Sequence, residues 1–544
     1  MKRLLYSIIL AFICIYTFAQ FNPTNCTSWV INPSFESGID DGWTNSGMKT
    51  QTNDESSAAK TGWTYAEKWV EAPNTLPDSY VQQTIKGLPN GTYELSATCH
   101  AEVQGTSTAP TRVFLFAGEE VVEVSATKKY KINITIESGE VTIGFKCVNT
   151  NANWMTVDHF QLIKTDGGLR TTAATPLNRG LMAINLATSG GTGNLISWRI
   201  RENDPEGYSY KLYRGVTAKS QTRKVNNGNP IRGKSNFIDT NGTATSYYRL
   251  EVLDTDGNVV DSMKAVKTWG NQTTTIPTTT PTDTRGLNAT YTPNDASFCD
   301  MDGDGEYEII LKWDPNNSKD AASNGTTSDT YFDCYKMNGK RLWRINQGPN
   351  IRSGAHTTPF IAWDLNGDGY GEFIIKTAPG TIDGNGNYVV MGDDDPLQNC
   401  LSSRGKPDKG PEYLTVFDGM TGAEISTIKY HTDYATGLNY WGDSNQNRSE
   451  RYTACMAYLD GKNRNPSAIF NRGYYAGSFV GAYDFDGYTL KERWISRNTT
   501  SGKGLWGEGA HWLTAADLDN DGSMKFNSVR QLLTITANCF TEQA

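Results

Sequence analysis

The sequence lacks any long stretch with the apolar period of an amphipathic helix, and apolar residues make up only 37% of its 544 positions. It is rich instead in residues that favour strands and turns, with 53 Gly, 27 Tyr and 14 Trp. Aromatic side chains suit pleated sheets, and glycine tolerates the backbone angles of tight turns. The missing helical pattern therefore argues against an α-helical protein and predicts an all-β fold.

Cysteine is also scarce. The nine cysteines are scattered along the chain and form no CxxC pair. Neither a zinc site nor a dense disulfide framework is therefore indicated. For Cys99 and Cys147 two interpretations stay open, a disulfide formed in an oxidising compartment and a pair of buried free thiols.

Long apolar runs are absent except at the start. The basic residues Lys2 and Arg3 precede an apolar run, residues 4–18, and the small residue Ala19 follows it. This order is typical of a secretory signal, so residues 1–20 are predicted to be a signal peptide. A membrane anchor is the weaker alternative, because spans need ~18 or more apolar residues. We expect an exported protein, in the periplasm, at the cell surface or in the medium, with no membrane span after signal removal.

Positive charge is in deficit as well. The 50 Lys and Arg against 59 Asp and Glu give a net charge of −9. No broad basic stripe runs along the chain, so nucleic acid is not an expected partner. An acidic protein that binds a polyanion must use local cations, either Arg and Lys clusters or bound metal, because its overall field repels the ligand.

The length exceeds the ~250–300 residues at which single cores stop growing, so several domains are expected. The first, residues 21–168, opens with N-P-S-F-E at 32–36 and ends on V-D-H-F-Q-L at 157–162. This pattern resembles carbohydrate-binding jelly-roll modules of the galactose-binding type. Trp43 and Trp154 are candidates for stacking on a sugar, and burial in the core is the commoner alternative.

The second domain, residues 171–270, contains alternating runs such as 195–200 and 208–214. Alternation of this kind predicts a fibronectin-like β-sandwich, and nothing in it demands chemistry. The Thr- and Pro-rich residues 273–284 predict an extended linker or exposed connection.

The third domain, residues 285–522, carries three acidic turns of one pattern. Oxygen-bearing side chains at alternate positions, a sharp glycine turn and a carboxylate eight residues after the first suit Ca²⁺, which takes ~6–8 oxygen ligands. Repetition favours calcium over ordinary Asp/Gly surface turns. β-type residues follow the first two turns, as in strand-associated loops of β-propellers. The expected ligands, with positions 306 and 370 contributing backbone carbonyls, are Asp300, Asp302, Asp304, Glu306, Glu308, Asp364, Asn366, Asp368, Tyr370, Glu372, Asp517, Asp519 and Asp521.

Longer stretches of the third domain closely resemble the rhamnogalacturonan lyases of polysaccharide lyase family 11. They include 300–318 (DMDGDGEYEIILKWDPNNS), 350–356 (NIRSGAH), 364–380, 440–451 (YWGDSNQNRSER) and 507–511 (GEGAH). The second domain is similar to the β-sheet domain that precedes the propeller in that family. The resemblance implies an eight-bladed, calcium-dependent β-propeller that cleaves the rhamnose–galacturonate bond of pectic rhamnogalacturonan I by β-elimination.

This reaction removes the C5 proton of a uronate, so the neighbouring carboxylate must be neutralised by a metal ion or by Arg and Lys. The family signature G-x-G-x-H implies that His511 is a metal ligand or a neighbour of the active centre. His356 is a second candidate, and a hydrogen-bonded structural role near a cleft is the commoner alternative for it. Arg451 is a candidate for the substrate carboxylate, as are Arg448 and Arg472, and loop-stapling is the equal alternative for all three. The residues do not identify the base.

The chain departs from the family pattern after Gly522. Lys525 stands where the first two turns have Glu308 and Glu372, and a cation cannot ligate calcium. One lost base near codon 523 would explain this, because permissible codons read in another frame give DEIQFGPATIDDNGKLLYRT, with a glutamate in place of the lysine. We therefore expect residues 523–544 to be a frameshifted tail, the propeller to be truncated, and lyase activity to be weak or lost.

Two other functions fit the same features. A secreted, non-catalytic glycan-binding or adhesion protein would bind sugar without forming unsaturated products. A glycoside hydrolase would create reducing ends and needs a pair of carboxylates, which cannot be isolated outside the acidic turns. The expected partner is pectic rhamnogalacturonan I, and the expected oligomeric state is a monomer.

Overall fold

The computed structural model describes residues 24–533 apart from the following positions. These are 53–57, 59–63, 87, 89, 166–173, 202–203, 205–206, 222, 272, 393, 433–440, 463, 499–505, 508, 510 and 529–530. The predicted signal peptide and residues 534–544 of the predicted tail lie outside the described residues. The only helices in the described part are the short 3-10 segments η1 (Thr27–Trp29), η2 (Ala187–Ser189) and η3 (Asn226–Gly228). The prediction of an all-β chain is confirmed.

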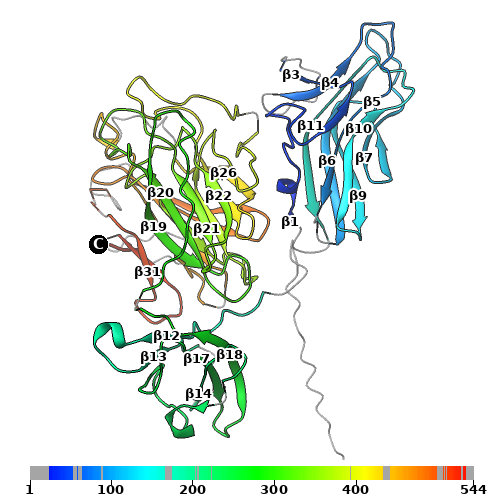
Figure 1. Cartoon of the computed structure of the whole chain (residues 1–544). Helices are drawn as coiled ribbons and strands as arrows, with labels where there is room; N and C mark the ends of the chain where they lie inside the picture. The colour runs from blue at the N-terminus through cyan, green and yellow to red at the C-terminus, as the bar shows by residue number, and fades with distance from the viewer. Residues whose placement is uncertain are drawn as a thin grey trace, which may run out of the picture.

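The first domain is built from two antiparallel sheets that pack face to face (Figure 1). One has the order β3-β4-β11-β6-β9 with β1 added on β11, and the other has the order β2-β5-β10-β7-β8. The strands are β1 (Thr24–Asn25), β2 (Thr44–Ser46), β3 (Lys49–Gln51), β4 (Tyr65–Trp69), β5 (Ser79–Lys86), β6 (Gly91–Glu102), β7 (Val113–Ala117), β8 (Glu120–Glu123), β9 (Lys128–Ile136), β10 (Glu140–Cys147) and β11 (Trp154–Lys164).

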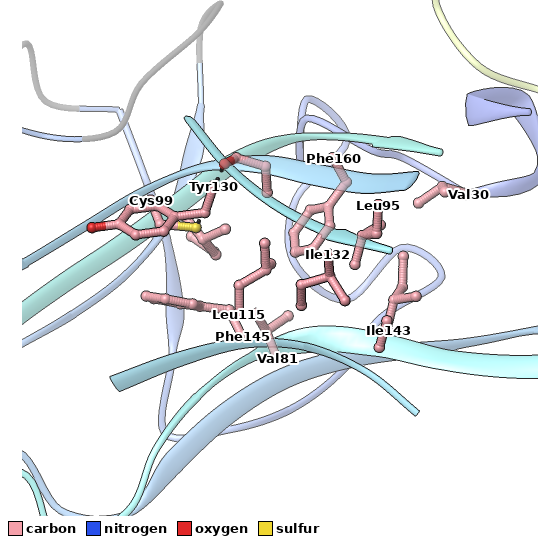
Figure 2. Packing of buried hydrophobic residues seen from close by; sticks show 14 of the residues in the cluster. Val30, Val81, Leu95, Cys99, Leu115, Tyr130, Ile132, Ile143, Phe145 and Phe160 are labelled. Carbon is pink, nitrogen blue, oxygen red and sulfur yellow. Dashed lines mark hydrogen bonds between the residues drawn. The ribbon is translucent and has the colours of Figure 1, made fainter. Parts of the chain in front are cut away.

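Strict alternation of side chains builds the core between these sheets. In β9 every second residue from Tyr130 to Ile136 is buried, while the residues between them face outward. Figure 2 shows Leu95 and Ile132 of one sheet packing toward Val81 and Phe145 of the other. Apolar side chains at period two therefore place one face of each sheet in the core.

Both tryptophans singled out in the sequence are buried, each only 5% exposed. Trp43 packs against Phe160 with ring centroids 4.8 Å apart, and its indole Nε1 donates to the carbonyl of Asn32. The indole of Trp154 donates to Glu67 over 3.1 Å. Neither ring offers a face to a sugar, so the core interpretation is the correct one.

Cysteine pairing is also resolved in the described residues. Cys99 and Cys147 are both buried free thiols, and the disulfide alternative is not realised. Burial raises the pKa of the Cys99 thiol well above its ordinary value, so the thiol stays protonated and behaves as a small apolar side chain.

The second domain has two smaller antiparallel sheets, β12-β13-β16 and β15-β14-β17-β18, around one core. Their strands are β12 (Met182–Asn185), β13 (Asn194–Ser197), β14 (Ser209–Gly215), β15 (Arg223–Lys224), β16 (Asn236–Asp239), β17 (Tyr247–Leu253) and β18 (Val259–Lys267). Buried Trp198 and Tyr210 meet edge to face, with ring centroids 4.9 Å apart, at the centre of this core.

The third domain repeats one unit: an antiparallel meander in which consecutive strands are neighbours. Three sheets have four strands and the last has three. They are β19 (Tyr291–Cys299), β20 (Glu308–Pro315), β21 (Tyr331–Tyr335) and β22 (Arg341–Asn346); β23 (Phe360–Trp363), β24 (Glu372–Thr377), β25 (Tyr413–Asp418) and β26 (Glu424–Lys429); β27 (Tyr452–Ala457), β28 (Ser467–Arg472), β29 (Ser478–Phe485) and β30 (Leu490–Asn498); β31 (Thr514–Ala516), β32 (Lys525–Ser528) and β33 (Gln531–Leu533).

The sheets stand beside one another through their first strands. β19 contacts β23, β23 contacts β27, and β27 contacts β31. The loops that precede these strands therefore gather at one end of the sheets, and the loops between the first and second strands gather at the other end. We call them the strand-start face and the acidic-loop face.

The Thr- and Pro-rich segment is more closely held than a free linker. Its Thr279 N–H donates to the Tyr335 hydroxyl over 3.0 Å, and its carbonyl accepts from Arg344 over 2.5 Å. The hydroxyl of Tyr331 donates to Thr282. Side chains of β21 and β22 thus tie the extended backbone along the first sheet of the third domain.

Candidate metal loops and the strand-start face

The three acidic turns occupy the same place in three sheets, between the first and second strands. Cys299 pairs with Glu308, Trp363 with Glu372, and Ala516 with Lys525. In each turn a glycine N–H donates over 2.9 Å to the first aspartate: Gly305 to Asp300, Gly369 to Asp364 and Gly522 to Asp517. One loop geometry is therefore repeated three times.

In the first turn the side chains converge. Ligand atoms of Asp300, Asp302 and Asp304 all lie within 4.8 Å of one another. One oxygen of Asp300 and one of Asp302 are buried and have no hydrogen-bond partner. Burial raises the pKa of Asp300 to about 6 and that of Glu308 to about 7. Unpartnered buried carboxylate oxygens are costly in a fold, so this donor set fits a hard divalent cation.

Lys336 reaches the first turn from the loop after β21, a contact that the sequence did not predict. Its Nζ lies 2.5 Å from Asp302 and 2.7 Å from Asp304. The ammonium offsets part of the negative charge of the turn. Only the position of the β21–β22 hairpin brings it there, so no local pattern around Lys336 signals the contact.

The second turn has the same hydrogen-bond pattern, with the neutral Asn366 where the first turn has an aspartate. The Leu365 N–H donates to Glu372 over 2.7 Å, as the Met301 N–H donates to Glu308 over 2.8 Å in the first turn. The Nδ2 of Asn366 donates to Glu372 over 3.1 Å. Burial raises the pKa of Asp364 as well, so the second turn also concentrates buried carboxylates.

The third turn differs. Asp517, Asp519 and Asp521 converge as the first three aspartates do. Lys525 extends into them, with its Nζ 2.5 Å from Asp521 and in contact with Asp519. An ammonium therefore lies among the carboxylates that the sequence assigned to calcium.

The strand-start face brings together three residues that are far apart in sequence. His356 precedes β23, Arg451 precedes β27 and His511 precedes β31. The rings of His356 and His511 have centroids 5.8 Å apart. The ring of Tyr474 lies 5.8 Å from that of His511 and beneath the Arg451 guanidinium, 5.1 Å from its Cζ.

The charge of this face is mixed. Arg451 lies 3.3 Å from Asp320 and also donates to Asn447 over 2.8 Å. Burial and then the charge of Arg451 lower the pKa of His356, so its imidazole is neutral at neutral pH. Two exposed aromatic residues, Tyr475 and Trp512, adjoin the cluster in sequence and are 50% and 62% exposed. The face thus offers a fixed cation, a neutral imidazole and exposed rings.

His511 and the third acidic turn lie at opposite ends of β31. His511 precedes the strand and Asp517 follows it, and an extended chain advances ~3.3 Å per residue. His511 is also absent from the groups of convergent metal-ligand side chains in the described residues. The observed partners of His511 are His356 and Tyr474, on the strand-start face.

Arg472 lies behind this face, fully buried. Its guanidinium lies 2.8 Å from Glu412 and 2.7 Å from Glu450, while Lys376 lies 2.6 Å from Glu412. Burial acts to raise the pKa of Glu412, but the charges of Arg472 and Lys376 outweigh burial and hold this pKa below its ordinary value. Arg472 also donates to the Ser449 carbonyl, so it holds the segment that carries Arg451 and cannot meet a substrate itself.

Comparison with known proteins agrees across both later domains. The model of the rhamnogalacturonan lyase family 11 C-terminal domain matches residues 273–530. The model of the rhamnogalacturonan I lyase beta-sheet domain matches residues 172–269. Among the described residues, no helix is long and apolar enough to cross a membrane.

Curated relatives and solved structures agree with these matches. Rhamnogalacturonan exolyase YesX of Bacillus subtilis is 42% identical over 64% of this chain and 54% of its own length. Rhamnogalacturonan endolyase YesW of the same organism is 40% identical over 66% of this chain and 55% of its own length. This chain spans about half the length of these curated relatives.

The crystal structure of YesX has a TM-score of 0.58 to this chain at 39% identity, covering 65% of this chain and 56% of the other. The Bacillus licheniformis rhamnogalacturonan lyase PL11 has a TM-score of 0.57 at 38% identity, covering 66% and 59%. Two adjoining domain models and relatives near 40% identity agree on one assignment: residues 172–530 of the chain belong to rhamnogalacturonan lyase family 11.

Proposed function

We propose that this protein is a calcium-dependent lyase that cleaves the rhamnose–galacturonate bond of rhamnogalacturonan I by β-elimination. The observation that carries the proposal is the convergence of His356, His511 and Arg451 on the strand-start face. Family membership supplies the reaction class, and the relatives named above are described as rhamnogalacturonan lyases.

The acidic loops and the strand-start face have separate roles in this proposal. The first two turns would hold calcium through Asp300, Asp302, Asp304 and Glu308, and through Asp364, Asn366, Asp368 and Glu372. Calcium bound there neutralises buried carboxylates and ties each turn to the start of the next strand. Because these turns lie at the far ends of the strands, we assign the substrate carboxylate to Arg451 and not to an ion in the turns.

The groups of the strand-start face suit the steps of β-elimination. Arg451 can pair with the uronate carboxylate, which stabilises the charge that develops when the C5 proton leaves. His356 is the candidate base, because a neutral imidazole accepts a proton. His511, 5.8 Å from it between ring centroids, is positioned to share that proton or to protonate the leaving C4 oxygen. The exposed rings of Tyr475 and Trp512 suit stacking on sugars.

The same proposal covers the architecture of the three domains. We interpret the first domain as a jelly-roll carbohydrate-binding module, the second as a fibronectin-like sandwich, and the side-by-side meanders of the third as blades of a calcium-binding β-propeller. We also propose that the protein is exported and monomeric, with pectic rhamnogalacturonan I as its partner.

Product analysis tests the function. Rhamnogalacturonan I is incubated with the protein, and ultraviolet absorbance of the unsaturated uronate is recorded together with new reducing ends. A lyase produces both signals. Reducing ends without absorbance would establish a hydrolase. Retention of the polysaccharide with neither signal would establish a non-catalytic glycan-binding protein and overturn the proposal.

A further inference from the structure

A cavity lies where the first domain meets the third, and its lining residues belong neither to the acidic turns nor to the strand-start cluster. Its volume is about 220 Å³. The first domain contributes the turn around Asn32 and the bulge of β11, and the third contributes the loop around Asn387 and the start of β26. The Asn32 N–H donates to the Asn387 side chain over 3.2 Å, which links the two domains at the rim. Figure 1 shows β26 on the side of the third domain that faces the first.

The first-domain wall is held in an unusual backbone conformation. Asn32 and His159 both have positive φ, 49° and 55°. His159 lies in a bulge of β11, where the pairing with β6 shifts between Asp158 and Gln161. Bulges of this kind re-aim side chains, and here His159 and Gln161 line the cavity. Left-handed backbone at non-glycine positions is concentrated at binding sites.

The third-domain wall carries two carboxyl groups. Asp383 is 3% exposed and accepts from the Asn387 and Glu424 N–H groups over 2.8 and 3.1 Å. Glu424 lies beside it. Burial raises the pKa of Asp383 to about 6 and that of Glu424 to about 7. Near neutral pH Asp383 accepts hydrogen bonds as a carboxylate, and Glu424, whose pKa lies at about 7, can also donate one while it is protonated.

The lining chemistry selects a neutral, hydroxyl-rich ligand. Amide, hydroxyl and carboxyl groups line both walls, with the ring of Tyr388 among them. No Lys or Arg is present among the described residues that line the cavity. The Nζ of Lys129 donates to Gln161 at the first-domain wall, while Asp383 and Glu424 on the opposite wall would repel a uronate. A metal ion fits poorly as well, because backbone N–H groups already engage the carboxylate of Asp383.

We propose that this interdomain cavity binds one neutral monosaccharide unit, with Gln161 and His159 on one wall and Glu424 and Tyr388 on the other. Its volume is below the ~300–1,000 Å³ of sites for larger ligands, which suits a single sugar ring and not a chain. Only the source of that sugar, a neutral unit of the pectic polymer, rests on the proposed function. A sugar unit bound in this cavity would therefore contact the first and third domains at once, so that both domains bind the same glycan.

Ligand-observed NMR on the full chain tests the site with L-rhamnose, D-galactose, L-arabinose and sodium D-galacturonate as probes. We expect millimolar binding of at least one neutral sugar and at least 5-fold weaker binding of galacturonate. Gln161→Ala and Glu424→Gln, one from each wall, should each weaken the neutral sugar at least 5-fold. Glu120→Gln on exposed β8 is the matched control and should bind as the wild type does.

Three results would overturn the proposal: no binding of any neutral sugar, equal binding of galacturonate, or unchanged binding in both wall variants. Thermal unfolding of each variant identifies any that has lost its fold. In that case, sugar binding by the variant on the opposite wall tests the proposal. Unsaturated-product absorbance is measured separately, so sugar binding without lyase activity would reject the proposed function and leave the cavity assignment intact.

Discussion

The Nζ of Lys525 lies 2.5 Å from the Asp521 carboxylate, inside the third acidic turn. The same strand position holds Glu308 in the first turn and Glu372 in the second. Two turns therefore end in a carboxylate that can complete a calcium cage, while the third ends in a lysine. Lys336, which approaches the first turn from another loop, leaves Glu308 in its place there.

This difference predicts the calcium stoichiometry. Lys525→Glu should add one bound calcium per chain in a calorimetric titration, because it removes an ammonium and supplies the missing ligand. Lys525→Gln is the matched control, since it removes the charge without supplying a carboxylate, and it should leave the stoichiometry unchanged. If Asp519→Asn bound one calcium fewer than the wild type, the third turn of the wild type would already bind metal and the prediction would be wrong.

Calcium should stabilise the fold through the first turn. A ligand present at 100 times its Kd contributes about 2.7 kcal/mol to the free energy of unfolding, so a chelator should lower the Tm. Glu308→Gln should remove much of the calcium-induced rise, because a buried ligand oxygen loses its charge. Glu306→Gln is the control, as its exposed side chain is not an expected ligand. Equal effects of the two variants would contradict the ligand assignment.

Loss of an arginine from the buried ion network should lower the unfolding free energy far more than loss of an arginine from an exposed ion pair. Arg472→Met leaves Glu412 and Glu450 without their shared guanidinium and should cost ~3–5 kcal/mol of unfolding free energy. Arg493→Met removes a pair with Asp460, which is 46% exposed, and should cost at most about 1 kcal/mol. Chemical denaturation of both variants measures the difference. A loss below 1 kcal/mol for Arg472→Met would show that the network is dispensable.

The acidic cavity wall predicts a pH dependence of stability. Burial raises the pKa of Glu424 from 4.5 to about 7, so the folded state holds a proton that the unfolded chain releases near pH 4.5. Stability from this group is present below pH 4.5 and is lost as the pH rises to about 7. Glu424→Gln should remove that loss, a relative gain of at most ~3 kcal/mol above pH 7.

Thermal unfolding from pH 4 to 8 measures this gain, with Glu120→Gln as the exposed control. A difference in Tm between the wild type and Glu424→Gln that stays constant from pH 4 to 8 would show that the Glu424 carboxyl does not titrate in this range.

The acidic turns were predictable because their chemistry is local. The alternate spacing that identifies residues 300–308 also dictates the hydrogen bonds from Gly305 and Met301 that shape the turn. The all-β class was predictable for a similar reason, since alternation and turn residues act over a few positions. Neither the approach of Lys336 nor the burial of Trp154 follows from spacing, because both depend on which strands pack together.

The strand-start face was only partly predictable. The family resemblance identified His511 as a candidate, and the sequence offered His356 and Arg451 beside it, but their convergence depends on β23, β27 and β31 standing side by side. The family signature left His511 as either a metal ligand or a neighbour of the active centre, and β31 separates it from the third acidic turn. Arg472 and Arg451 had the same two alternatives in the sequence. Full burial makes Arg472 a structural staple. The Arg451 side chain is 14% exposed and pairs with Asp320 and Asn447, so for Arg451 both alternatives stay open.

The most direct test of the account compares unsaturated-product absorbance from rhamnogalacturonan I for the wild type, Arg451→Ala and Arg493→Ala at saturating calcium. We expect a rise in absorbance for the wild type, a roughly 100-fold smaller rate for Arg451→Ala, and a wild-type rate for Arg493→Ala. An unchanged rate in Arg451→Ala, or no unsaturated product from the wild type, would contradict the assignment of lyase chemistry to the strand-start face.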